Sequence, residues 1–380
     1  MNLLIVCHYG LYQDLSCSFV HAQAAAYAAL GHQVRVLIPL PYGKADRQGR
    51  RFSERLTVTQ TDGVELYDLR FLSLSNFGVK CGWNTLSAKK AVQICWGQVA
   101  KDFVPDVIHA HTLGLDSELG AWLKQRLHCP LVVTTHGSDT SIPVEQGRAA
   151  SLKPLCDAAD RIVAVSSTLA DKLRTSGTMV PISVILNGFQ LRFLLRGAAK
   201  VPMTFLQVGN LLEQKKFYVT IQAFSVIREQ YPEAVLTIIG QGPERPALEG
   251  LCRKLGVEDA VRFLGQVPNE EVLDQMARAQ FFCMPSVREG FGIVYLEAMA
   301  SGCITIGTEG EGIANLIKNG ENGFLVPPDD PDDIAAVMEW CLAHPEEATA
   351  IADRGRQDAL SLTWDHNAEQ YIKLFKELCS

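Results

Sequence analysis

Short apolar runs alternate with helical stretches along the chain, and this alternation limits the possible fold more than any other feature. Residues 2–7 form an apolar run, residues 19–30 carry an alanine-rich helical pattern that stops at Gly31, and residues 34–38 form a second apolar run. This β-loop-α-β order is typical of a parallel sheet covered by helices. The series continues with apolar runs at residues 107–109, 131–134 and 162–165.

A second series of the same kind begins with an apolar run at residues 203–208. Further strands are predicted at residues 235–239, 261–264, 281–284 and 303–306, and helices at 217–229, 245–255, 270–279 and 293–300. Gly188, Gly197 and Pro202 indicate a linker over residues 188–202, and a charged helix is predicted from about Asp365 to Leu378. The sequence therefore predicts an α/β protein with two doubly wound domains of similar size and a cleft between them.

Length and composition exclude several classes of protein. The chain has 380 residues, 47% of them hydrophobic and 20% charged, which is enough apolar mass for more than one core and excludes a disordered or collagen-like chain. No apolar run reaches the ~18 residues of a membrane span, and the first residues lack the basic region of a signal peptide. The eleven cysteines form no C-x-x-C pair, so we expect free thiols in a reducing cytosol and no metal site.

Charge is distributed unevenly between the two halves. Residues 1–198 carry a net charge of +5 and residues 199–380 a net charge of −12. Either the first half faces an anionic partner or this is ordinary surface variation. The basic run at residues 44–55 is consistent with contact with a lipid surface or with a solvated loop, and we favour the loop.

The segment at residues 286–302 has the strongest chemical pattern. Gly290 and Gly292 flank Phe291 directly after a predicted strand, and a helix is predicted to start at about Ile293. The free N–H groups and the positive dipole end of such a helix form a binding site for an anion or a hydroxyl. Two carboxylates accompany that site, eight residues apart in the sequence, and carboxylates accept hydrogen bonds from vicinal diols. They are Glu289 and Glu297, and the apolar neighbours of Glu297 argue against an ordinary exposed residue.

A second segment, at residues 207–217, combines a strand, a turn at Gly209 and two cations, Lys215 and Lys216, at the entry of a helix. A cation beside a helix N-terminus is unfavourable unless an anion also lies there, and phosphate is the obvious anion. The alternative is a solvated lysine pair.

Other polar residues receive simpler interpretations. His109 and His111 end a predicted strand; we interpret His109 as structural and leave His111 open. Asp116 is predicted to cap a helix over residues 117–127, and Asp330 with Asp332 to cap a helix at about Ile334 rather than to bind metal.

A nicotinamide enzyme is disfavoured. Gly240 and Gly242 resemble part of a dinucleotide-binding loop, but Arg245 replaces its third glycine and the first βα turn has no such motif.

Together these segments resemble the GT-B-fold retaining glycosyltransferases of family 4, also called glycosyltransferase group 1. The E-x7-E motif is Glu289 to Glu297, and further similar segments occur in family order at residues 134–139, 159–166, 184–189, 239–243 and 322–328. The resemblance implies two Rossmann-like domains that face a central cleft, with residues 1–190 and a returning C-terminal helix (363–380) on the acceptor side. It implies that residues 200–362 bind the nucleotide sugar.

The resemblance also implies roles for individual residues. Glu289 would contact the donor sugar, Lys215 the diphosphate and Glu297 the ribose, while His136 would lie near the donor sugar on the acceptor side. The remaining donor-binding residues would be Gly209, Asn210, Lys216, Gly240, Gly242, Val267 and the amides of Gly290, Phe291, Gly292 and Ile293.

The chain departs from the family pattern at three places. Asn210 stands where arginine is usual, Lys216 stands where glycine is usual, and Cys17 lies in a first loop that lacks the frequent Gly-Gly pair.

We therefore expect a cytoplasmic enzyme that transfers a sugar from a nucleotide-diphosphate donor, with UDP favoured, to a saccharide or lipid-linked saccharide in cell-surface polysaccharide biosynthesis. The resemblance implies retention of anomeric configuration, no metal or other cofactor, and a leaving diphosphate that takes the acceptor proton. Peripheral contact with the inner membrane face stays open, and no nucleic-acid partner is expected. The alternatives are a catalytically inactive donor-binding subunit that scaffolds or regulates a partner and, less favoured, a nucleotide-sugar epimerase.

Overall fold

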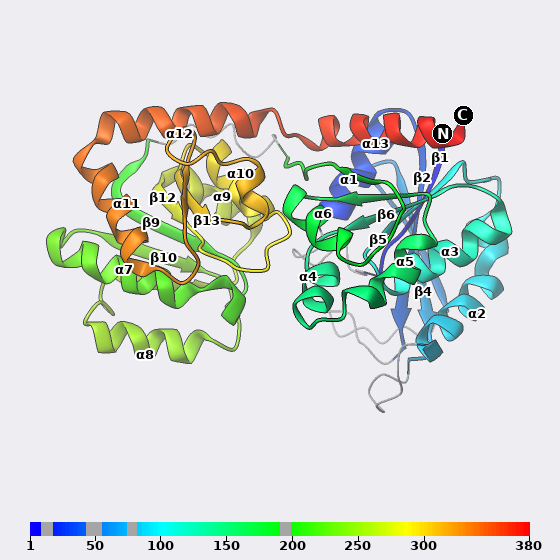
Figure 1. Cartoon of the computed structure of the whole chain (residues 1–380), viewed down its shortest axis with the longest axis horizontal. Coiled ribbons are helices and arrows are strands. Elements are labelled where there is room, and N and C mark those ends of the chain that lie inside the picture. Colours follow the sequence, from blue (N-terminus) through cyan, green and yellow to red (C-terminus); the bar gives the residue numbers. More distant parts are fainter. Residues whose placement is uncertain (9–17, 43–54, 74–81, 191–198) are drawn as a thin grey trace. The chain divides into compact units, whose positions relative to one another are not determined.

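The computed structural model describes residues 1–8, 18–42, 55–73, 82–190 and 199–380. These divide into two compact units, Met1–Gly188 with Trp364–Ser380, and Phe189–Thr363 (Figure 1). Of the positions discussed above, Cys17, Gly197 and all of the basic run at residues 44–55 except Arg55 lie outside the described residues.

The first unit contains an eight-stranded sheet in the order β3-β4-β2-β1-β5-β6-β7-β8. All neighbouring strands are parallel except the antiparallel pair β3 and β4. Its strands are β1 Asn2–Val6, β2 Gln33–Pro41, β3 Leu56–Thr61, β4 Val64–Phe71, β5 Val107–His111, β6 Leu131–Thr135, β7 Arg161–Ala164 and β8 Ile182–Val184. Its helices are α1 Ser18–Ala29, α2 Gly82–Val99, α3 Leu115–Leu127, α4 Ser138–Glu145, α5 Lys153–Asp157, α6 Ser167–Arg174 and α13 Trp364–Cys379.

Burial explains why β1, β5 and β6 occupy the centre of this sheet. The side chains of β5 and β6 are buried along their whole length, as expected for parallel strands covered on both faces. The chain leaves β1 for β2 on one side and later places β5 on the other side of β1. The switch point of the sheet therefore lies between the carboxyl ends of β1 and β5.

The C-terminal helix α13 belongs to the first unit, as the GT-B expectation requires. It packs against α1, with the Phe375 ring 5.9 Å and the Tyr371 ring 6.3 Å from the ring of Tyr27. A buried hydrogen bond of 2.6 Å from Gln23 to Asn367 also joins the two helices.

The second unit contains a six-stranded parallel sheet in the order β11-β10-β9-β12-β13-β14. Its strands are β9 Val201–Val208, β10 Val235–Ile239, β11 Val261–Gly265, β12 Ala279–Cys283, β13 Ile304–Thr308 and β14 Phe324–Val326. Its helices are α7 Phe217–Gln230, α8 Arg245–Leu255, α9 Asn269–Arg278, α10 Ile293–Ala300, α11 Pro331–Ala343 and α12 Pro345–Leu360.

The winding of this second sheet reverses at β9. The chain proceeds from β9 through β10 to β11 on one side, and from β12 through β13 to β14 on the other. Right-handed crossovers then place α7 and α8 on one face of the sheet and α10 on the opposite face (Figure 1). The switch point therefore lies where the loops after β9 and β12 begin.

One predicted helix cap is wrong and another is confirmed. The helix expected after Asp116 begins at Leu115, and its cap is Gly114, whose N–H donates to Ser117 Oγ over 3.0 Å. Asp330 does cap α11, because its carboxylate accepts from the backbone N–H groups of Asp332 and Asp333.

Candidate functional site

Two loops from distant parts of the sequence meet at the switch point of the second unit. The loop after β9 carries Gln214 and Lys215, and the loop after β12 carries Val287 and Glu289. The Val287 N–H donates to the Gln214 carbonyl over 2.9 Å, and the Lys215 ammonium forms an ion pair with the Glu289 carboxylate. Both side chains are mostly buried, with 18% and 19% of their surfaces exposed. The structure thus joins two of the three residues for which a catalytic role is predicted.

Close backbone packing explains the glycines of the neighbouring loop after β10. A Cβ on Gly240 would lie 1.8 Å from the Gly209 carbonyl oxygen, and one on Gly242 would lie 2.2 Å from that of Leu211. The Leu211 N–H also donates to the Gln241 carbonyl over 2.9 Å. The two glycines therefore let this loop pack against the loop that leads to Lys215.

Contact of the nucleotide-sugar donor with Gly240, Gly242 and Val267 stays a prediction. Val267 follows β11 and is partly buried.

The segment from Gly290 to Ile293 forms the turn into α10. Gly292 has a φ of +79°, and a Cβ there would lie 2.6 Å from the Tyr295 ring, so glycine is required. The Phe291 side chain is buried in the core, which leaves its backbone as the group available to a ligand. Helix α10 starts at Ile293 as predicted, and its first N–H groups have no acceptor within the helix.

Glu297 lies on α10, one turn beyond Ile293. It is partly buried, and burial raises the pKa of its carboxyl to about 7. Within the residues that the structure describes, this carboxyl has no hydrogen-bond or ion-pair partner. Because a buried, unpaired carboxyl is costly, Glu297 is suited to a ligand that supplies the missing hydrogen bonds.

Lys216 and Asn210 differ from Lys215 in their surroundings. Lys216 has a left-handed φ of +52°, which explains why glycine is usual at this position. Its ammonium lies 2.9 Å from the Asp329 carboxylate and 3.4 Å from the Tyr218 hydroxyl, so it has partners other than Glu289. Asn210 is exposed at the turn after β9.

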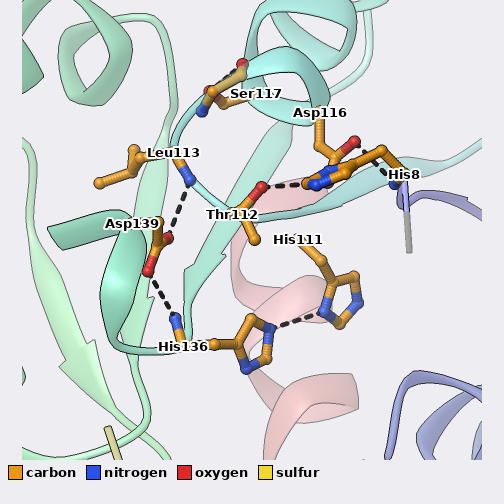
Figure 2. A network of polar contacts seen from close by, with 9 residues as sticks. His8, His111, Thr112, Leu113, Asp116, Ser117, His136 and Asp139 are labelled. Atoms are coloured by element: carbon orange, nitrogen blue, oxygen red, sulfur yellow. Dashed lines mark hydrogen bonds and ion pairs between the residues drawn. The ribbon is translucent and has the colours of Figure 1, made fainter. Parts of the chain in front are cut away.

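His136, the third predicted catalytic residue, lies in the first unit at the end of β6. Its ring stacks on His111 with centroids 5.2 Å apart, and its Nε2 lies 3.0 Å from His111 Nδ1 (Figure 2). The Asp139 carboxylate accepts from the backbone N–H groups of His136 and Leu113, at 3.2 and 3.0 Å, and so fixes this turn. Burial lowers the pKa of His136 to about 4, which keeps the imidazole neutral near pH 7.

His109 continues this cluster into the core. Its Nε2 lies 2.8 Å from Thr134 Oγ1, which in turn lies 2.9 Å from the Tyr371 hydroxyl on α13. Burial lowers the pKa of His109 to about 3 and that of His111 well below its usual value. Among the described residues, the second ring nitrogens of His109, His111 and His136 are buried without a hydrogen-bond partner, so protonation would leave N–H groups unpaired.

These three histidines predict acid sensitivity of the fold. Their pKa values are lowered in the folded state, so below pH 6.5 the unfolded chain binds protons first and stability falls as pH falls. Each contributes a loss of up to about 1.4 kcal/mol of unfolding free energy per pH unit. Urea denaturation at pH 7.5 and 5.5 measures the slope, which His109→Gln should reduce. Equal slopes in the two proteins would contradict a neutral His109.

Sequence reasoning missed a polar pair that also lies in the first unit. The buried Asp116 accepts hydrogen bonds from the backbone and the Nδ1 atom of His8, each 2.8 Å long, and from Thr112 Oγ1 over 3.1 Å (Figure 2). In the sequence, this pair could have been inferred from a histidine directly after β1 and an acid at the start of α3. The described residues contain no cluster of three or more His, Cys, Asp or Glu that could hold a metal ion.

Comparison with known protein families finds one matching family model for each half of the chain. The family model described as glycosyl transferases group 1 matches residues 196–358, and that described as glycosyl transferase 4-like domain matches residues 18–188. D-inositol 3-phosphate glycosyltransferase of Corynebacterium urealyticum is 34% identical over 178 residues, which are 45% of this chain and 42% of that relative. Glycogen synthase of Mycobacterium tuberculosis is 28% identical over 365 residues, which are 89% of this chain and 84% of that relative.

Solved structures share the fold over the whole chain. Sucrose-phosphate synthase from Thermosynechococcus elongatus superimposes with a TM-score of 0.80 at 21% identity and covers 100% of this chain and 99% of its own. Anabaena Alr3699/HepE in complex with UDP-glucose superimposes with a TM-score of 0.76 at 19% identity and covers 100% of both chains.

Proposed function

The chain is a GT-B glycosyltransferase that belongs to the group 1 glycosyl transferases, and we propose that it transfers a sugar from a UDP-sugar to a saccharide or lipid-linked saccharide. The observation that carries the proposal is the Lys215–Glu289 pair beside the start of α10. In this pair the lysine and the carboxylate neutralise each other. A donor would replace both contacts, with its diphosphate on Lys215 and its sugar hydroxyls on Glu289.

The other site residues support this arrangement. The amides of residues 290–293 would stabilise negative charge on the diphosphate or bind sugar hydroxyls. The unpaired carboxyl of Glu297 would accept hydrogen bonds from the ribose. UDP is favoured because the structurally similar Anabaena protein binds UDP and UDP-glucose.

We propose a mechanism with retention of anomeric configuration and without a metal ion. An acceptor oxygen bonds to the anomeric carbon on the face from which the diphosphate leaves, and the leaving diphosphate takes the acceptor proton. Lys215 and the α10 amides would stabilise the charge that grows on the diphosphate. Neutral His136 would help to orient the donor sugar as a hydrogen-bonding group.

The second candidate function is that of a donor-binding subunit without catalytic activity. Asn210 favours it, because an exposed amide stands where the family usually has a cation. A thermal-shift panel of UDP-, GDP-, ADP- and dTDP-sugars tests the donor site that both candidates require. At 100 times its dissociation constant, a ligand specific for the folded state adds roughly 2.7 kcal/mol to the unfolding free energy. If no nucleotide sugar of the panel raised the melting temperature, both candidate functions would be contradicted.

We further propose a role in cell-surface polysaccharide biosynthesis at the inner membrane face. No helix in the described part of the chain is long and apolar enough to cross a membrane. Helix α2 offers a surface for peripheral contact instead. Trp83, Leu86 and Ile94 are 46%, 61% and 53% exposed, and with exposed Lys90 they follow the i, i+3, i+7, i+11 spacing of one helix face. Since α2 contains no Asp or Glu, this face is suited to anionic lipid.

This surface predicts salt-sensitive binding to anionic vesicles. Each lysine near such a membrane contributes about 1 kcal/mol, and Lys90→Glu reverses that charge. The change of about 2 kcal/mol should weaken binding to phosphatidylglycerol vesicles by about 30-fold. Co-sedimentation at low and high salt measures this, with pure phosphatidylcholine vesicles for comparison. Leu86→Ala should also weaken vesicle binding, because it removes an exposed apolar side chain from this face. Val226→Ala, at a 38% exposed position on α7, is its control. Absence of vesicle binding at low salt would show that this helix does not bind membranes.

A further inference from the structure

The loop that follows β13 holds the backbone of Glu289 from both sides. Strands β12 and β13 are parallel neighbours, so their carboxyl ends lie at the same edge of the sheet (Figure 1). The Glu289 N–H donates to the Glu311 carboxylate over 2.8 Å, and the Gly312 N–H donates to the Glu289 carbonyl over 3.2 Å. Both backbone groups of Glu289 are therefore bonded to consecutive residues of one loop.

Close packing keeps this loop in place. A Cβ on Gly312 would lie 2.0 Å from the Gly290 carbonyl oxygen, so only glycine fits there. The next residue, Ile313, is fully buried and anchors the loop in the core. The loop therefore has little freedom to move away from Glu289 and Gly290.

The Glu311 carboxylate does not serve as an ordinary helix cap. Glu311 directly precedes the 3₁₀ helix Gly312–Asn315, and a side chain at such a position usually accepts from the first N–H groups of the helix. Within the residues that the structure describes, Glu311 makes no such bond to its own helix, and its carboxylate accepts from a residue 22 positions earlier. The contact therefore fixes Glu289 rather than the start of this helix.

The position of the Glu289 backbone becomes important when a donor binds. In the unliganded protein the ion pair with Lys215 orients the Glu289 side chain. In the proposed function the donor replaces this pair, with its diphosphate on Lys215 and its sugar hydroxyls on Glu289. The direction of the Glu289 carboxylate then depends on its own backbone, and a binding group must be held to within about 0.5 Å of the productive geometry.

Of the two contacts that hold Glu289, only the one with Glu311 is made by a side chain. A hydrogen bond to a carboxylate is also stronger than one between neutral groups. The side chain at position 311 therefore decides how firmly Glu289 is held.

We propose that Glu311 is a positioning residue of the donor site, whose carboxylate fixes the backbone of Glu289 so that the Glu289 carboxylate meets the hydroxyls of the donor sugar. This deepens the proposed function and rests on it. Because Glu311 acts through Glu289, its loss should weaken recognition of the sugar and spare that of the nucleotide, whose diphosphate and ribose are assigned to Lys215 and Glu297.

Three variants separate the hydrogen bond from the charge. Glu311→Ala removes both the acceptor and the negative charge, whereas Glu311→Gln keeps an amide oxygen that can accept from the same N–H. The matched control is Glu309→Ala, which removes an exposed carboxylate two residues earlier on the same loop.

Calorimetric titration of the full chain with UDP-glucose and with free UDP tests the proposal. Glu311→Ala should weaken binding of UDP-glucose by about tenfold, as expected for the loss of one strong hydrogen bond, and should change binding of UDP by less than about twofold. Glu311→Gln should restore most of the lost affinity, and Glu309→Ala should bind both ligands as the wild type does. Unchanged binding of UDP-glucose in Glu311→Ala would overturn the proposal, and so would equal weakening for both ligands, which indicates general damage to the site.

Hydrogen exchange without any ligand distinguishes failure of this inference from failure of the proposed function. In a peptide that contains residues 287–290, mass spectrometry should show slow exchange of the Glu289 amide in the wild type, Glu311→Gln and Glu309→Ala, and faster exchange in Glu311→Ala. Equal exchange in the wild type and Glu311→Ala would overturn the inference even in a protein that transfers sugar. If exchange differs as expected but the wild type binds neither UDP-glucose nor UDP, the proposed function is the part that fails.

Discussion

Replacing Lys215 by alanine should lower kcat by about 10²–10³-fold and weaken donor binding much less. Bond cleavage leaves negative charge growing on the diphosphate, and only interactions that strengthen in the transition state raise the rate. Removal of one preorganised charge stabiliser typically costs this much. Because Asn210 stands where the family usually has arginine, Lys215 must supply most of the local positive charge. The measurement is kcat and KM with one confirmed donor.

The adjacent lysine provides the control for this prediction. Lys216 lies against Asp329 and Tyr218, so Lys216→Ala should have a much smaller effect on kcat. Asn210→Arg should preserve or raise activity by restoring the usual cation. Equal and mild effects at positions 215 and 216 would mean that the diphosphate binds elsewhere, and would favour the inactive-subunit alternative.

Glu297→Gln should weaken binding of the donor and of free UDP in parallel, by more than tenfold. The carboxylate would accept charge-assisted hydrogen bonds from the ribose, each contributing about 1.5–3 kcal/mol, and glutamine loses that charge. Burial raises the pKa of Glu297 to about 7, so the ionised form that binds best becomes populated as pH rises from 6 to 8. Calorimetric titration with UDP should show affinity rising over this range in the wild type but not in the variant.

Glu297→Gln should weaken UDP binding but raise the stability of the nucleotide-free protein. A carboxyl whose pKa is raised on folding loses its stabilising contribution as pH rises through the folded value. Without nucleotide, Glu297→Gln should therefore be more stable than the wild type at pH 8, with a smaller difference at pH 6. Thermal unfolding at both values measures this. Unchanged UDP affinity in the variant would refute the ribose assignment.

The apolar runs predicted the central strands because burial on both faces leaves a clear signal. Strand β5 is an example. Strand β3 gave no such signal, since its side chains are mostly exposed and it is held by pairing with β4. Helix α2 was missed because it exposes apolar residues, which weakens the difference between its faces.

Tertiary partners explain why parts of the site could not be predicted from local patterns. Asp116 has the sequence context of a helix cap, but its carboxylate binds His8, which is 108 residues away. Lys215 and Lys216 are equivalent in sequence, yet the left-handed backbone at Lys216 directs it to Asp329 while Lys215 meets Glu289. The resemblance pointed to Lys215 and Glu289 separately, and only the fold brings them into contact.

The most direct test of the account is whether the purified chain transfers sugar from UDP-glucose. Released UDP and the glycoside product are followed by NMR. The acceptors to be tried include D-inositol 3-phosphate and glycogen, which appear in the names of two relatives. The account predicts acceptor-dependent UDP release and a product with the anomeric configuration of the donor. UDP-glucose that binds but stays intact with every acceptor would contradict transfer, and a donor sugar altered without any acceptor would indicate an epimerase.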